Sequence, residues 1–415
     1  MSRRKHGNIK AANAEALRRL KASQALLVDV APAGDVIPKL GANDFLHAGP
    51  PLLNGWNEAC GALRGAVLGS LIHRGAARGP EDAEQMASSG QIRLVSASEH
   101  DVLATYGGVI ARETRVFVVE NREGGTRAFS AINEGRGKAL RYGSHDPDTL
   151  NRYAWMEGEF ADLLGCAVRH RGGVDLFEIL SQALQMGDDG HSRQKAAGAL
   201  FANAVAPSLC EVCGEKSAGV RALTFLATNE IFFLPLTMAA AKAAMLWAEG
   251  IDGSTIVTAM AANGSRWGIR ISGCGKRWFT APVPVVTGHY FEGFDVSDAS
   301  PVIGDSEIAE TFGFGAFAMS GAPALARFMG GSVDAMQRLS LPMFDITSAE
   351  HERFRIPILD YRGAPLGIDA EKVVSKNIEP IFNTGIAHKD PGIGQIGAGF
   401  GRVPMHCFKQ ALAQL

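Results

Sequence analysis

A glycine-rich stretch near the C-terminus, NTGIAHKDPGIGQIGAGFG at 383–401, limits the possible folds of this chain more than any other segment. It contains six glycines, and among them stand an imidazole, an ammonium and an amide, from His388, Lys389 and Gln395. Because glycine lacks a Cβ and adopts positive φ at little cost, its backbone N–H groups can converge on an anion. The stretch therefore predicts either an anion-binding loop with titratable groups at its mouth or a glycine-rich turn packed tightly between two elements.

The composition is that of an ordinary globular enzyme and argues against several classes of partner. Of the 415 residues, 46% are hydrophobic and 20% are charged, and the net charge of −2 leaves no basic excess for binding nucleic acid. The sequence predicts neither a signal peptide nor a membrane-spanning helix, because its apolar runs are short or interrupted. Six scattered cysteines are typical of reduced thiols, so we expect a cytoplasmic protein without a disulfide framework.

Hydrophobic patterning predicts a multidomain protein that combines α/β and α+β parts. Short apolar runs such as VFVVE (116–120) alternate with helical patterns, which predicts an N-terminal α/β domain over residues 1–145. Helical spacing dominates residues 146–235, and we expect these to form a small helical domain. Residues 236–415 are predicted to form a C-terminal α+β domain that carries the glycine-rich loop.

Four local patterns in the C-terminal part predict particular elements. The alanine-rich segment 237–249 has helical spacing, and Asn263-Gly264 is a strong hairpin turn signal between two strand-like runs. Residues 316–329, rich in alanine and glycine, are predicted to form a helix. Asp305 or Ser306 is expected to cap another short helix over residues 307–312.

Two further segments combine charge with glycine. The first, at 120–143, follows a predicted strand, which is where α/β sheets usually bind their ligands. It carries Glu134 together with five basic residues: Arg122, Arg127, Arg136, Lys138 and Arg141. The second, QMGDDGHSRQK at 185–195, joins two predicted helices and contains His191. The alternatives are a solvated surface and a capped helix junction. No metal is expected, because the spacing matches no standard signature.

Generic catalytic motifs are missing from this sequence, including GxSxG, Walker A, HExxH and a GxGxxG that follows a strand. Longer and more unusual segments are more informative: HAGPP (47–51), CGALRGAVLGSL (60–71), VVENREGGTRAFSAINEGRGKALRYG (118–143), QMGDDGHSRQKAA (185–197), STIVTAMAANGSRWGIRISG (254–273), IGDSEIAET (303–311), LDYRGAPLGID (359–369) and NTGIAHKDPGIGQIGAG (383–399). Together they resemble the FdrA-associated family of the YlbE type, one branch of which is a subunit of oxamate carbamoyltransferase. The resemblance covers nearly the whole chain from about residue 12.

That resemblance implies a subunit of a carbamoyltransferase complex, working beside an FdrA-like subunit and a second small subunit in an oligomeric assembly. The implied reaction converts oxalurate and phosphate into oxamate and carbamoyl phosphate. Phosphate and carbamoyl phosphate are then substrates, and no cofactor is expected. Two alternatives stay open: a non-catalytic scaffold subunit of an FdrA-like complex, and an amide or ureido hydrolase that uses water. Departures from the family pattern at residues 187–195 leave the exact substrate open.

Carbamoyl transfer to phosphate requires an anion cradle, donors for the carbamoyl oxygen and a group that exchanges a proton with the amide nitrogen. The catalytic candidates are His388, because an imidazole titrates near neutral pH, together with Lys389 and Glu134. The candidate binding residues for a small anionic substrate come from the three polar segments: Asn133, Arg122, Lys138, Arg141, His191, Asn383, Thr384, Gly392, Gly394, Gln395 and Gly397.

Overall fold

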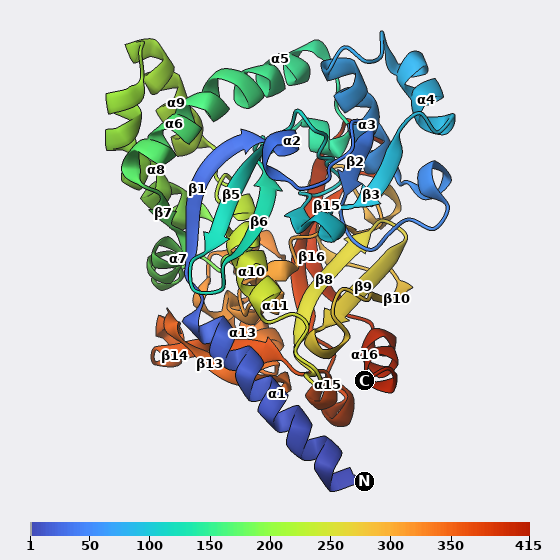
Figure 1. The fold of residues 1–415 in the computed structure, drawn as a ribbon, viewed down its shortest axis with the longest axis vertical. Helices are drawn as coiled ribbons and strands as arrows, with labels where there is room; N and C mark the ends of the chain where they lie inside the picture. Colours follow the sequence, from blue (N-terminus) through green and yellow to red (C-terminus); the bar gives the residue numbers. More distant parts are fainter. Residues whose placement is uncertain (1) are drawn as a thin grey trace.

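The computed structural model describes residues 2–415, with side chains from residue 8 onward, and shows a mixed α/β protein with five sheets in this range. This confirms the mixed class expected from the sequence, whereas the division into three domains at residues 145 and 235 stays a prediction. The N-terminal helix α1 (Ser2–Ala22) extends away from the body of the protein (Figure 1). No helix within the described residues is long and apolar enough to span a membrane.

A five-stranded sheet organises the first half of the chain. Its order is β4-β6-β5-β1-β7, formed by β4 (Val102–Leu103), β6 (Thr126–Ala131), β5 (Arg115–Asn121), β1 (Ala25–Pro32) and β7 (Val174–Asp175). Strand β5 pairs antiparallel with both β1 and β6. The predicted strand VFVVE is thus confirmed at the centre of the sheet.

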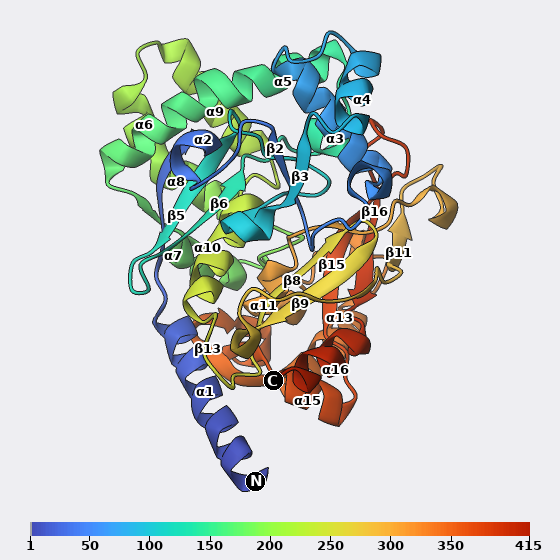
Figure 2. The same ribbon diagram turned by 45° about the vertical axis from the view of Figure 1, so that its right-hand side comes forward.

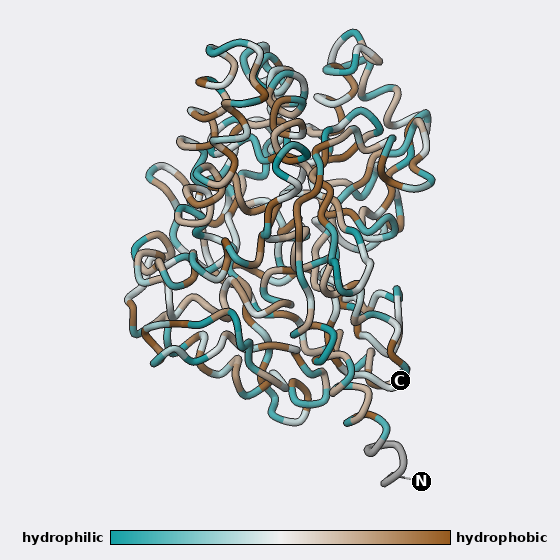
Figure 3. The backbone as a smooth tube through the Cα atoms, turned by 60° about the vertical axis from the view of Figure 1, so that its left-hand side comes forward, coloured by the Kyte–Doolittle hydropathy of each residue, from teal (hydrophilic) through white to brown (hydrophobic). Residues whose placement is uncertain are grey.

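Both faces of this sheet are covered, which explains the unbroken apolar run in β5. Phe117 and Val119 belong to a core with the buried helix α10 (Leu234–Trp247). Val116 and Val118 point into a second core, which contains helix α3 (Gly61–His73) and the parallel pair β2 (Asp44–His47) and β3 (Arg93–Ser96). Figure 3 shows these apolar segments running through the interior, with hydrophilic segments at the outer turns.

Helices cover the first core along the top and the left-hand side of the sheet in Figure 1. They are α5 (Pro147–Trp155), a π-helical turn at Met156–Phe160, α6 (Ala161–Arg171), α7 (Leu176–Gln185), α8 (Lys195–Val212) and α9 (Lys216–Thr228). Helix α10 is buried over almost its whole length, from Pro235 to Met245, as expected for a helix that is apolar on every side. The alanine-rich helix predicted here is confirmed.

The second half contains two small sheets that pack together around a third core (Figure 2). One has the order β10 (Phe279–Pro282), β9 (Arg266–Ile271), β8 (Val257–Asn263) and β12 (Ile303–Gly304). The other has the order β11 (Thr287–Tyr290), β16 (Gln395–Arg402) and β15 (Ile381–Ala387). The rings of Trp267 and Phe382 stack across the interface at 4.4 Å. The predicted hairpin turn at Asn263-Gly264 is confirmed between β8 and β9. Helices α15 (Ala370–Lys376) and α16 (Met405–Ala413) and the ribbon β13 (Thr347–Ile356) with β14 (Arg362–Ile368) complete this half.

The glycine-rich stretch is a β-hairpin, and the prediction of a loop over residues 383–401 was wrong. Strands β15 and β16 pair antiparallel and leave only residues 388–394 as the connection. Alternate glycines of β16 lie where a Cβ would collide with a neighbour: Gly397 with the carbonyl oxygen of His289, and Gly399 with that of Thr287 at 2.3 Å. The glycines therefore serve the close approach of strand β11.

The predicted helix over residues 316–329 was also wrong. The segment contains two short 3₁₀ turns, Gly315–Phe317 and Met319–Gly321, and the short helix α12 (Leu325–Phe328). Gly315 has a φ of 59°, and a Cβ there would meet the carboxylate of Glu310 at 2.1 Å. Pro323, which lacks a backbone N–H, prevents the two halves from joining into one helix.

Candidate functional site

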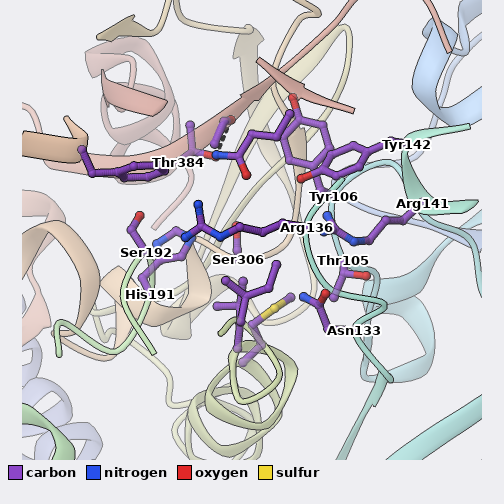
Figure 4. A pocket seen from close by; sticks show the side chains of 16 residues that line it. Thr105, Tyr106, Asn133, Arg136, Arg141, Tyr142, His191, Ser192, Ser306 and Thr384 are labelled. Atoms are coloured by element: carbon purple, nitrogen blue, oxygen red, sulfur yellow. Dashed lines mark hydrogen bonds between the residues drawn. The ribbon is translucent and has the colours of Figure 1, made fainter. Parts of the chain in front are cut away.

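A cavity of about 70 Å³ lies where the three polar segments of the sequence meet. The hairpin tip contacts the segment after β6, because Gly392 donates its N–H to the Tyr142 carbonyl at 2.8 Å. The α7–α8 junction reaches the same hairpin through a hydrogen bond from Ser192 to the Asn383 side chain at 2.8 Å. Figure 4 shows side chains of these three segments pointing toward one another around the cavity. Thr105 and Tyr106, which precede β5, and Ser306 also line it.

Two guanidinium groups, from Arg136 and Arg141, line this cavity. Arg141 is 6% exposed, stacks on the Tyr142 ring at 4.1 Å and donates from Nη2 to the Gly135 carbonyl at 2.6 Å. Its buried Nε has no hydrogen-bond partner within residues 8–415. Buried polar atoms are almost always paired, so this unpaired donor, on a side chain that lines the cavity, is an exception. Arg136 is partly exposed and stacks on Phe328 at 5.0 Å.

The segment that carries both arginines is fixed by Glu134. Its carboxylate accepts the backbone N–H of Leu140 at 2.8 Å and of Arg141 at 3.1 Å. Burial raises the pKa of this carboxyl, while the neighbouring Arg141 charge opposes that shift. The structure places Glu134 behind the cavity wall as a clamp on the backbone. The neighbouring Asn133 lines the cavity and accepts the N–H of Gly135 at 2.9 Å.

His191 lines the cavity from the α7–α8 junction and pairs with a carboxylate from a distant part of the chain. Its Nδ1 lies 2.8 and 3.0 Å from the two carboxylate oxygens of Glu310, which is fully buried. Burial would lower the pKa of this imidazole, but the charge and hydrogen bonds of Glu310 win and raise it to about 9. Glu310 was not among the candidates from the sequence, because nothing in the surrounding segment IGDSEIAET (303–311) marks it as a partner of His191.

A second carboxyl, from Glu307, is buried near His191 without any hydrogen-bond partner among the described side chains and backbone. It is 1% exposed, and desolvation raises its pKa to about 8 even though the His191 charge opposes this. Asp305, two residues earlier, accepts the N–H of Gly49 at 2.7 Å and of Ala104 at 2.9 Å. It thus joins distant backbone segments, and the prediction that its side chain caps a helix was wrong.

Several backbone amides of the hairpin connection, expected to be free for an anion, are already bonded within the protein. The N–H of Gly392 is used by the Tyr142 carbonyl, as described above. The N–H of His388 donates to the Gly394 carbonyl, and the N–H of Lys389 donates to the Asp298 carbonyl. The N–H of Asp390 donates to Nδ1 of the His388 ring. The Lys389 ammonium donates to the Ser297 carbonyl at 2.8 Å. His388 and Lys389 therefore lie outside the residues that line the cavity.

The remaining candidates divide between the cavity and other places. Thr384 and Gln395 line the cavity, and Asn383 lies behind it, buried, with its amide donating to Asp189 at 2.8 Å. Gly394 packs against the Gly137 carbonyl, and Gly397 faces β11. Lys138 and Gly392 line a separate open hollow beside α3. Arg122 is exposed in the β5–β6 turn. No group of three or more His, Cys, Asp or Glu residues in the described chain is arranged to hold a metal ion.

Fold and cavity together define a class: a mixed α/β protein with a partly open cavity whose wall combines arginine, amide and hydroxyl groups with apolar side chains. Comparison with known proteins gives the family. The profile of the family described as oxamate carbamoyltransferase subunit AllG matches residues 92–306. The chain is 39% identical over 407 residues to the Escherichia coli (strain K12) protein of that name, covering 97% of both chains. The chain therefore belongs to the AllG family, which confirms the resemblance seen in the sequence.

Two further relatives support this placement. The Escherichia coli protein named "Uncharacterized protein YahG" is 39% identical over 404 residues, which cover 97% of this chain and 85% of that protein. A crystal structure of a conserved protein of unknown function from Enterococcus faecalis V583 superimposes with a TM-score of 0.96 at 38% identity. It covers 99% of this chain and 98% of that one. The fold is thus shared along almost the whole chain.

Proposed function

We propose that this chain is the substrate-binding subunit of a carbamoyltransferase complex, and that its cavity binds oxalurate or a similar ureido acid. Phosphate is the second substrate, and the products are oxamate and carbamoyl phosphate. The relative named as a subunit of oxamate carbamoyltransferase supports the reaction class. The reaction needs no cofactor, since both the donor and the acceptor of the carbamoyl group are substrates.

The observation that carries this proposal is the buried guanidinium of Arg141, a side chain that lines the cavity and keeps one nitrogen, Nε, without a partner among the described residues. A guanidinium binds planar carboxylates and phosphates well, and its hydrogen bonds to such anions are stronger than those between neutral groups. Arg136 adds a second positive charge at the same cavity, while Asn133 and Gln395 offer amide groups for the carbamoyl and oxamate oxygens. These groups supply positive charge and amide donors for the carboxylate and carbonyl oxygens of a small ureido acid.

The cavity also limits the size of the ligand. At about 15 Å³ for each water-sized position, 70 Å³ accommodates roughly five of them. Oxalurate alone has nine heavy atoms and phosphate adds five, so the proposal requires this partly open cavity to widen when the two substrates bind. As partners we propose an FdrA-like subunit and a second small subunit, following the family's description as part of a complex.

The test combines ligand binding by the isolated chain with turnover by the complex. We expect oxamate and carbamoyl phosphate to raise the melting temperature of the purified chain, because they bind the folded state alone. Arg141→Met removes charge-assisted hydrogen bonds of about 1.5–3 kcal/mol, so we expect roughly 10- to 150-fold weaker oxamate binding. Arg171→Met, an exposed arginine at the end of α6, is the matched control.

Each other outcome points to a different function. If the isolated chain binds neither ligand and Arg141→Met leaves turnover by the complex unchanged, this subunit is a scaffold. Cleavage of oxalurate at full rate in phosphate-free buffer would identify a hydrolase. The proposal requires turnover that depends on phosphate and on Arg141 together.

A further inference from the structure

The pair formed by His191 and Glu310 has the geometry of an oriented acid–base group. Both Glu310 oxygens lie within hydrogen-bond distance of Nδ1, and one of them also accepts the N–H of Ala316 at 3.0 Å and of Asn383 at 3.2 Å. The carboxylate is therefore held from three directions in a fully buried position. It fixes the ring orientation and keeps a proton on Nδ1.

The opposite ring nitrogen is the one available to a ligand. Nε2 of His191 makes no hydrogen bond to any residue that the structure describes, and the ring forms part of the cavity wall. The backbone N–H of His191 donates to the Asp189 carboxylate at 3.0 Å, so the residue is anchored at both ends. A nitrogen that can carry a proton is thus held at the same cavity as Arg141.

Other histidines do not offer this arrangement. His388 lies outside the cavity, and its Nδ1 accepts the N–H of Asp390 at 2.9 Å. His351 is buried and bonded to the Phe312 carbonyl at 2.7 Å. Of the histidines in the described chain, His191 alone lines the cavity.

We propose that His191, oriented by Glu310, transfers the proton in the carbamoyl transfer. This rests on the proposed function. A phosphate oxygen attacks the carbamoyl carbon of oxalurate and forms a C–O bond. The C–N bond then breaks, and its electron pair stays on the nitrogen of the leaving oxamate. That nitrogen takes the proton from Nε2 of His191, and Nε2 then receives the proton of the attacking hydrogen phosphate. One C–O bond replaces one C–N bond, one proton moves from phosphate to nitrogen, and no redox partner is needed.

The charges around His191 support its role as the acid. Glu310 faces the ring from α11 (Ile308–Thr311), Glu307 precedes that helix, and Asp189 belongs to the α7–α8 junction. All three favour the imidazolium, and the pKa of about 9 keeps His191 protonated at neutral pH. The two arginines that line the same cavity supply the positive charge that binds the anion. The leaving nitrogen is too basic to depart unprotonated, so an acid at this position accelerates the step.

The test uses the complex with its partner subunits. His191→Gln keeps a hydrogen-bond donor for Glu310 but cannot transfer a proton, so we expect kcat to fall at least 100-fold while the Kd for oxamate stays within threefold. His191→Ala leaves room for free imidazole, which we expect to restore activity at least tenfold. His406→Gln, an exposed histidine on α16, is the matched control.

Glu310 is a positioning residue, so its test needs a readout beyond activity. In NMR spectra of the chain, the His191 ring should titrate near pH 9, and Glu310→Gln should move that titration down by at least one pH unit. The alkaline limb of the pH–rate profile should move with it.

The inference fails if His191→Gln keeps kcat within threefold while Arg141→Met still abolishes oxamate binding; the proposed function would then survive. If the wild-type complex shows no phosphate-dependent cleavage, the proposed function and this chemistry both fall. Failure of the Nε2 resonances to titrate near pH 9 would overturn the dyad independently of any turnover.

Discussion

Replacing Glu307 with glutamine should stabilise the protein at alkaline pH and change little at acidic pH. Glu307 is 1% exposed, and neither of its carboxyl oxygens has a partner in the described chain. Desolvation raises its pKa from 4.5 to about 8, with Glu310 and Asp305 adding to the shift and His191 opposing it. The native state therefore keeps a proton between pH 4.5 and 8 that the unfolded chain releases, so the stability of the wild type falls as pH rises through this window.

The magnitude follows from the size of the shift. At about 1.4 kcal/mol per pKa unit, the wild type loses roughly 3 kcal/mol at this residue between pH 5 and pH 8. Glutamine is uncharged and nearly isosteric, so Glu307→Gln escapes this loss. For a chain of 415 residues with an unfolding entropy of about 2 cal/mol/K per residue, that difference corresponds to about 3–4 °C in melting temperature.

The assay compares the melting temperatures of wild type and Glu307→Gln at half-unit steps from pH 5 to pH 8.5. Because Glu307 also raises the pKa of His191, the comparison is read below pH 8, where folded His191 stays protonated in both proteins. Glu123→Gln, at an exposed position in the β5–β6 turn, should give a difference that does not change with pH. A constant difference for Glu307→Gln over the whole range would refute a buried, protonated carboxyl beside the cavity.

Three further predictions address packing and buried charge. Gly399→Ala should lower the free energy of unfolding, measured by urea titration, by roughly 3 kcal/mol, because its Cβ would lie 2.3 Å from the Thr287 carbonyl oxygen. Gly158 has open space around it, so the control Gly158→Ala should have little effect in the same titration. Asp305→Ala should cost about 2–5 kcal/mol by leaving the amides of Gly49 and Ala104 unpaired, and an unchanged urea midpoint would contradict this. Lys242 is 1% exposed, and burial lowers its pKa to about 8. Between pH 8 and 10.5 the unfolded chain therefore holds a proton on this lysine that the folded chain has lost. As pH rises through this range, the wild type should gain stability relative to Lys242→Met. A difference that is flat over that range would show that Lys242 is not desolvated.

Local patterns with a single physical cause were predictable from the sequence. The hairpin at Asn263-Gly264 follows from positive φ at the turn, and Gly264 has a φ of 89°. The buried strand β5 and the buried helix α10 follow from their apolar runs. Each of these depends on residues that are neighbours in the sequence.

The glycine-rich stretch shows why one pattern can carry the wrong meaning. Gly397, Gly399 and Gly401 recur every second residue, which places them on one face of a strand. On that face, β11 and the Phe382 ring approach too closely for a side chain. The recurrence of glycine at every second residue indicated a strand, whereas the high glycine content of the stretch favoured a loop. The stretch still pointed to the correct region, because Thr384 and Gln395 line the cavity.

Glu310 could not be found because its role depends on a partner 119 residues away. No local feature of IAETF distinguishes a carboxylate that orients a histidine from one that caps a helix. In contrast, Arg141 was found because charge and glycine after a strand are a local signal. Sequence reasoning thus named several cavity-lining groups, such as Arg141 and His191, but it also named His388 and Lys389, which lie outside the cavity, and it missed Glu310.

Two unpaired polar groups of opposite character, the Nε of Arg141 and the carboxyl of Glu307, occur at or next to one cavity. A buried donor or acceptor without a partner costs about 1–3 kcal/mol, so a fold that leaves both unpaired is under strain unless something binds there. An anion beside Arg141 satisfies the donor and adds a negative charge near His191. That charge strengthens the imidazolium and so keeps the acid loaded when substrate is present. If the proposed function holds, binding and proton transfer are coupled through the same few buried side chains, and neither role belongs to the glycine-rich hairpin alone.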